Sequence, residues 1–167
     1  VKTKFDKNNE ETKEKVGELL LEKPIEVLFE GYNENIYGKV TTDDFINEEL
    51  SKIKENFCYF FTGHWLQGGL GNDRKDVGAL IKIFYETFGR KPNKPALILK
   101  TTGATPSVLD RHEVLGKIEQ IKKQFPGQKL PPVYLLHGDL TDDQMNALYN
   151  HPKVKAMTMF THGEGFG

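Results

Sequence analysis

The sequence predicts an α/β domain with a doubly wound, Rossmann-like parallel sheet. Five short apolar runs, each bounded by Pro, Gly or Asn, have the length and composition of buried strands. Between them lie segments whose apolar residues recur with the 3.6-residue period of an α-helix. Strands that alternate with helices along a chain are typical of a parallel sheet covered on both faces.

The predicted strands share a content of bulky apolar and β-branched residues and a turn signal at each end. They are residues 25–29, 57–62, 96–99, 133–136 and 154–160. Pro95 and Pro132 stand immediately before two of them, where the missing N–H group removes little from the ladder of a sheet. We therefore expect a single sheet built from these five runs.

The predicted helices are defined by their apolar stripes. The first two contain Val77, Leu80, Ile81, Phe84, Tyr85 and Phe88, and then Val114, Ile118, Ile121 and Phe125. A shorter helix carries Ile46, Leu50 and Ile53. In the last helix, Thr141 and Gln144 have the spacing of a capping box, and Met145, Leu148 and Tyr149 form the expected buried face, with Pro152 beyond the end.

Residues 1–24 are expected to form a peripheral segment, helical over residues 2–23 and ended by Pro24, whereas residues 25–167 are expected to form the domain. The net charge of −1 gives no electrostatic reason to expect nucleic-acid binding. A single cysteine, Cys58, cannot form an intrachain disulfide, which favours a reducing, cytoplasmic location. No apolar run reaches membrane-spanning length, so no transmembrane segment is expected. The absence of an initiator methionine indicates a fragment.

In a parallel α/β sheet, ligands bind outside the carboxyl ends of the strands. The loop after the second predicted strand, residues 63–75, is rich in glycine, ends in Arg74 and Lys75, and leads into a helix. Backbone N–H groups, the helix dipole and two cations in one place favour a phosphate group. A surface loop with solvated charges is the alternative interpretation.

The other strand-end loops are also candidates for ligand contact. Residues 100–106 contain Thr101 and Thr102, small residues that permit close approach of a ligand but also suit a plain turn. Gly138 could allow a planar base to approach the backbone, or could belong to a turn in which Thr141 caps the helix. After the last strand, residues 161–167 contain three glycines and Glu164, a second candidate cradle for an anion.

These segments together resemble the group 1 glycosyltransferases, retaining enzymes of the two-domain GT-B fold. The resemblance covers roughly residues 25–167 and is most specific in residues 137–149, which end in Leu-Tyr, and in the sequence Glu-Gly-Phe-Gly at 164–167, the opening of the family's E-x7-E motif. Residues 57–63 followed by Arg74, Lys75 and Asp76 are similar to the family's phosphate-binding segment, and residues 30–33 to the start of its second domain. The resemblance implies that this chain is the donor-binding half of such an enzyme.

The resemblance also implies site roles. Arg74 and Lys75 would grip the donor diphosphate while Gly63 lets the backbone approach it, and the backbone around Gly138 and Leu140 would hold the base. Glu164 would act in catalysis by contacting the donor sugar, and the amides of Gly165, Phe166 and Gly167 would meet sugar hydroxyls or phosphate. The implied ligand is a nucleoside-diphosphate sugar, with no cofactor. An Asp-x-Asp cluster for a metal-bound diphosphate is missing, and Asp142 and Asp143 are interpreted as first-turn helix charges.

The sequence departs from the family at two points. His64 stands where the family usually has an arginine after the strand-end glycine, and it is a candidate contact together with His162. The second glutamate of the E-x7-E motif and the acceptor-binding N-terminal domain are not in this sequence, so the acceptor is undefined and the fragment alone is expected to be inactive. The alternative is a non-catalytic nucleotide-binding or regulatory α/β domain. An epimerase or phosphorylase of related architecture is a further possibility.

Overall fold

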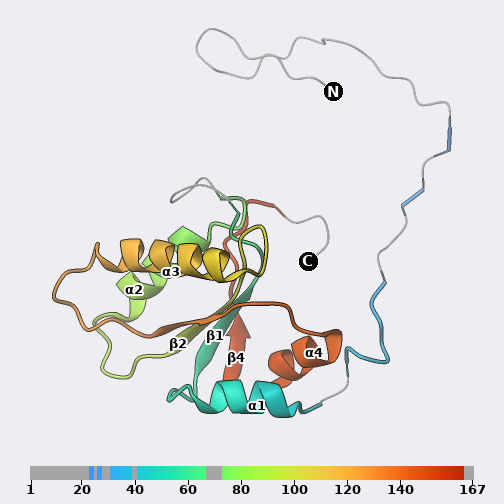
Figure 1. The fold of residues 1–167 in the computed structure, drawn as a ribbon, viewed down its shortest axis with the longest axis horizontal. Coiled ribbons are helices and arrows are strands. Elements are labelled where there is room, and N and C mark those ends of the chain that lie inside the picture. Colours follow the sequence, from blue (N-terminus) through green and yellow to red (C-terminus); the bar gives the residue numbers. More distant parts are fainter. Residues whose placement is uncertain (1–22, 25, 28–30, 39–40, 67–72, 164–167) are drawn as a thin grey trace, which may run out of the picture. The chain divides into compact units, whose positions relative to one another are not determined.

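The chain alternates helices and strands, as the sequence predicts. The computed structural model describes residues 23–24, 26–27, 31–38, 41–66 and 73–163. The elements in chain order are α1 (Asp44–Ser51), β1 (Cys58–Thr62), α2 (Val77–Phe88), β2 (Ala96–Lys100), α3 (Val108–Lys122), β3 (Val133–Leu136), α4 (Asp142–Asn150) and β4 (Val154–Met157) (Figure 1).

The four strands form one parallel sheet in the order β3-β2-β1-β4. The chain moves outward from β1 through β2 to β3, and then returns across the sheet to place β4 on the other side of β1. This 3-2-1-4 arrangement is the order of the corresponding strands in Rossmann folds. The predicted fold class, a doubly wound Rossmann-like α/β fold, is thus confirmed.

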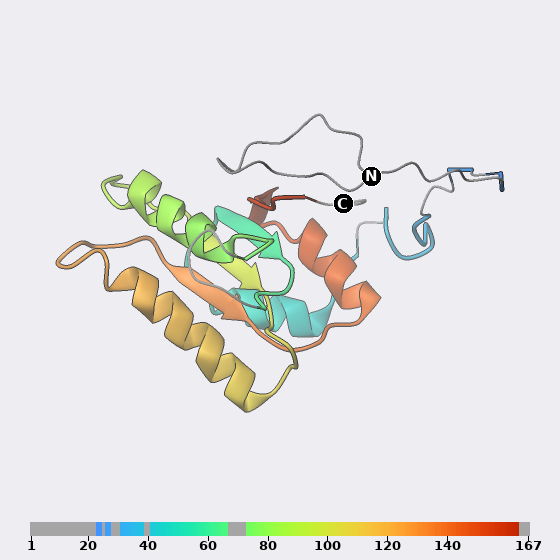
Figure 2. The same ribbon diagram turned by 90° about the horizontal axis from the view of Figure 1, so that it is seen from above.

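Helices cover both faces of the sheet. Figure 2 shows α2 and α3 on one side of the strands and α1 and α4 on the other. Along β1, Tyr59 and Phe61 pack with α2 and α3, whereas Cys58 and Phe60 pack with α1 and α4. Because the side chains on both faces of β1 are apolar, the sequence of β1 is continuously hydrophobic and does not alternate between apolar and polar residues. Full burial of each Phe stabilises the fold by about 1.5–3 kcal/mol.

Side-chain caps set the starts of three helices. Asp43 accepts a hydrogen bond from the amide of Ile46, and Ser107 accepts one from the amide of Asp110. At α4, Thr141 and Gln144 form the complete capping box that their spacing predicts. These bonds satisfy amides that have no partner inside the helix.

Several element boundaries differ from those predicted. Strand β1 begins one residue later and β2 ends one residue later, and α1 and α3 end before Ile53 and Phe125, the last residues of their predicted stripes.

The start of α3 and the end of β4 also differ. Helix α3 begins at Val108, ahead of the apolar stripe that starts at Val114. The buried stripe does not mark the first turn, because Val108 and Leu109 are 71% and 76% exposed. Strand β4 ends at Met157 instead of residue 160, although Thr158 still donates a backbone hydrogen bond to Phe60 at 2.8 Å. The apolar residues after Met157 therefore lengthen the hydrophobic stretch of the sequence but do not lengthen strand β4.

Some predictions concern residues that the structure describes only in part. The predicted helix over 2–23 lies outside the described residues except for Lys23. Of the predicted strand 25–29, Glu26 and Val27 are described; neither is in a strand, and Val27 is 81% exposed. The chain divides into a unit Val1–Gly31 and a unit Tyr32–Gly167, and the second contains all eight elements. Within the described part, none of the helices has the length and apolarity needed to cross a membrane.

Candidate functional site

The strand order reverses between β1 and β4, so the loops that follow these two strands leave the sheet side by side. The backbone amide of His162 donates to the carbonyl oxygen of Arg74 at 2.9 Å. The Arg74 Nη1 group in turn donates to the carbonyl oxygen of Gly163 at 2.6 Å. Two loops that are far apart in the sequence are thus joined at the carboxyl edge of the sheet. Crevices at such reversal points are where Rossmann-like sheets bind ligands.

Gly63 and Lys75, both predicted phosphate-site residues, lie against each other in this region. Gly63 has a φ angle of +149°, which side-chain-bearing residues rarely adopt. A Cβ atom on Gly63 would lie 3.2 Å from Cζ of Phe61 and 3.4 Å from Cε of Lys75. The glycine therefore leaves room for the half-buried stem of Lys75 beside the end of β1.

Two acidic residues at the N-terminus of α2, Asp73 and Asp76, make contacts that the sequence interpretation did not anticipate. The buried Asp73 carboxylate accepts a hydrogen bond from the amide of Val77 at 3.3 Å. Asp76 has a left-handed backbone with φ 46°, and its carboxylate lies 3.4 Å from Nε2 of His162. Asp73 and Asp76 balance the charges of Arg74 and Lys75, and one helix amide is already bonded. A phosphate group here would use the remaining donors.

The loop after β2 is packed against the loop after β1. Oγ1 of Thr102 lies 3.1 Å from Nδ1 of His64. The carbonyl oxygen of Thr102 accepts a hydrogen bond from the amide of Trp65 at 2.8 Å. Thr101 and Thr102 are only 1% and 6% exposed. Trp65 is 3% exposed, so it packs in the core instead of lining an open cleft. These threonines fix the path of the loop, while His64 itself remains exposed.

A buried pair, His137 and Asp110, links the carboxyl ends of β2 and β3. Nε2 of His137 lies 2.7 Å from Oδ2 of Asp110, and the amide of Gly103 donates to the same oxygen at 2.8 Å. The two side chains are only 7% and 8% exposed. Burial alone would raise the pKa of Asp110, but the hydrogen bonds from His137 and Gly103 outweigh it and lower the pKa.

Sequence reasoning missed this pair, although one signal was present. Asp110 stands four residues before Val114 and eight before Ile118, so it lies on the apolar stripe of α3. An acidic residue at a core position of a helix requires a hydrogen-bonding partner.

Gly138 and Leu140 follow β3, which is two strands away from β1. Adjacent strands lie about 4.8 Å apart, so this loop begins roughly 10 Å from the end of β1. Gly138 has a φ angle of +103°, and its Cα faces open space. Leu140 packs partly on the core beneath α1 and α4. Burial lowers the pKa of Lys100, at the end of β2, and outweighs the negative charge of Asp139, which acts to raise it.

The remaining predicted site residues, Glu164, Gly165, Phe166 and Gly167, lie outside the described residues. Among the residues that are described, His, Cys, Asp and Glu form no group of three that could hold a metal ion. Of the five histidines, His112 is exposed and His151 is half-buried.

Comparison with known proteins identifies no relative. No protein-family model, no curated protein and no solved structure matches this chain.

Proposed function

We propose that this domain binds the diphosphate of a nucleotide sugar and is the donor-binding half of a retaining glycosyltransferase. The observation that carries the proposal is the joining of the loops after β1 and β4 through Arg74, His162 and Gly163. These loops contain the glycines and cations that the sequence offers to a phosphate, and they lie where the strand order reverses.

The chemistry of glycosyl transfer matches these groups. Negative charge develops on the leaving diphosphate, and a cation such as Lys75 close to exposed backbone would stabilise it. Lys75 lies over Gly63, at the end of the central strand β1. By the family resemblance, Glu164 would contact the sugar.

A second candidate is a regulatory α/β domain without catalytic activity. The carboxylates of Asp73 and Asp76 favour this alternative, because they offset the positive charge of Arg74 and Lys75 at the N-terminus of α2. Charge balance of this kind weakens the attraction for a diphosphate.

Calorimetry with uridine, adenosine and guanosine diphosphates, with and without EDTA, tests the binding. We expect one diphosphate to bind without added metal, and Lys75→Ala to weaken it by roughly tenfold or more, since a charge-assisted hydrogen bond contributes about 1.5–3 kcal/mol. Lys82→Ala is the matched control, because Lys82 lies on α2 at Val77–Phe88 with a side chain 42% exposed and paired with Glu86. Silence at millimolar ligand from a folded sample would overturn the proposal.

The sugar site requires a separate comparison. Glu164→Gln should weaken binding of the matching nucleotide sugar while leaving binding of the nucleoside diphosphate unchanged. Equal affinities of the variant and the parent for the sugar-bearing ligand would favour the non-catalytic alternative.

A further inference from the structure

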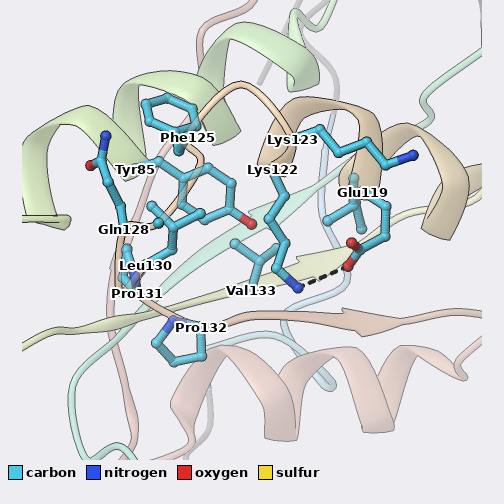
Figure 3. Close-up of a pocket in the computed structure, with 12 residues that line it drawn as sticks. Tyr85, Glu119, Lys122, Lys123, Phe125, Gln128, Leu130, Pro131, Pro132 and Val133 are labelled. Atoms are coloured by element: carbon cyan, nitrogen blue, oxygen red, sulfur yellow. Dashed lines mark hydrogen bonds and ion pairs between the residues drawn. The ribbon is translucent and has the colours of Figure 1, made fainter.

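A pocket lies at the opposite edge of the sheet from the candidate donor site. It is a hollow of about 600 Å³ between the last turns of α2 and α3 and the start of β3. Its walls include Tyr85, Ile118, Phe125 and Leu130, and Val133 contributes to its floor (Figure 3). Pockets that hold small molecules have volumes of roughly 300–1,000 Å³, so this one has a suitable size.

Tyr85 supplies an unused polar group to this pocket. The residue is 3% exposed, and its ring packs edge-on against Phe125 with centroids 5.6 Å apart. Within the part of the chain that the structure describes, the hydroxyl has no hydrogen-bond partner. Figure 3 shows it pointing into the pocket, toward Lys122 and Val133. Among the described residues, no fully buried side-chain oxygen or nitrogen lacks a hydrogen-bond partner, so the Tyr85 hydroxyl is open to solvent in the pocket. A ligand atom that accepts its hydrogen bond can take the place of that water.

The rim of the pocket has an excess of positive charge. Lys122 is paired with Glu119 at 3.0 Å, and Lys123 also lines the pocket, with its ammonium group directed away from Tyr85 in Figure 3. Burial and then the charge of Glu119 raise the pKa of Tyr85 to about 12, so its hydroxyl keeps its proton and can donate. The pocket thus combines an apolar wall, one hydroxyl donor, and two lysines against one glutamate.

We propose that this pocket binds a small amphiphilic carboxylate, with the apolar body against Phe125 and Leu130 and the carboxylate accepting a hydrogen bond from Tyr85. The cations Lys122 and Lys123 would attract the same carboxylate. This binding site is separate from the donor edge and does not depend on the function proposed for it.

The experiment is a titration of the full chain with 3-phenylpropionate, followed by two-dimensional amide NMR, with 3-phenylpropan-1-ol as the uncharged ligand of the same shape. We expect shifts confined to the surroundings of Tyr85, Phe125 and Val133, and weaker binding of the alcohol. Tyr85→Phe should weaken carboxylate binding by roughly two- to tenfold, the effect of one hydrogen bond.

Two variants complete the test. Tyr149→Phe is the matched control, because Tyr149 packs with Phe60 on the other face of the sheet, and it should leave binding unchanged. Lys123→Ala should weaken the binding of 3-phenylpropionate and leave the binding of 3-phenylpropan-1-ol unchanged. Three results would overturn the proposal: amide shifts elsewhere on the surface, equal affinities for 3-phenylpropionate and the alcohol, or an unchanged affinity of a folded Tyr85→Phe protein for 3-phenylpropionate.

Discussion

Replacing Asp110 by Asn should destabilise the fold even though the side chain keeps its shape. Oδ2 of Asp110 accepts hydrogen bonds from His137 at 2.7 Å and from Gly103 at 2.8 Å. In the variant, the amide oxygen can still accept both bonds, but the negative charge that strengthens them is lost. Charge-assisted hydrogen bonds contribute about 1.5–3 kcal/mol and neutral ones about 0.5–1.5 kcal/mol. Over two bonds, the expected loss in the free energy of unfolding is about 2–3 kcal/mol.

Urea denaturation at pH 7, followed by circular dichroism, measures this loss. Asp139→Asn is the matched control: Asp139 is exposed on the next loop, two residues after His137. A surface substitution of this kind should change the free energy of unfolding by less than about 0.5 kcal/mol. Equal stabilities of the two variants would refute the reasoning, because they would show that the buried carboxylate adds nothing beyond its shape.

The effect of Asp110 should also depend on pH. The pKa of this carboxyl is lower in the folded protein than its ordinary value of roughly 4, because the bonds from His137 and Gly103 outweigh the effect of burial. The unfolded chain therefore holds the proton more tightly. The stabilisation is present above about pH 4 and is lost as the pH falls through the folded-state value. The gap between the parent and Asp110→Asn should accordingly shrink in urea titrations performed below pH 4.

Three further substitutions have definite expected outcomes. Thr141→Ala removes one half of the capping box with Gln144 and should cost about 1 kcal/mol in urea denaturation; an unchanged midpoint would contradict the role of the cap. Gly103→Ala would place a Cβ atom 2.1 Å from Oδ1 of Asp110. It should lower the free energy of unfolding by more than about 2 kcal/mol, because the core is overpacked and the hydrogen bond to Asp110 is disturbed. A variant as stable as the parent would show that the loop can shift. Tyr85→Phe removes a hydroxyl without a partner, so calorimetry should find thermal stability equal to or above that of the parent, and a large decrease would reveal a hidden partner.

The core could be predicted because each buried strand and helix carries its own periodic signal. The run at β1 is apolar on both faces, and α2 shows three turns of 3.6-residue periodicity, so both elements follow from local sequence. The start of α3 was less visible, because Val108 and Leu109 are exposed while Asp110 between them and Val114 is buried. In that turn, hydrophobicity and burial do not coincide.

The site was less predictable than the core because it depends on contacts between distant loops. The sequence indicated that Gly63 and Lys75 belong to one candidate site, and the two residues are in contact range. It could not indicate that the Asp73 carboxylate accepts a hydrogen bond from a helix amide, or that Asp76 has a left-handed backbone. The roles of Glu164 and of the nucleotide remain predictions.

The place of β4 in the sheet has a consequence for the synthesis of the chain. Val154 of β4 pairs with Cys58 of β1, about a hundred residues earlier. A ribosome adds about 5–20 residues per second, so one edge of the central strand stays unpaired for roughly 5–20 s after it has been made. During that time, the apolar residues of β1 lie beside a row of free backbone donors and acceptors, the arrangement that recruits strands from other molecules. The newly made chain is therefore prone to aggregate until β4 emerges.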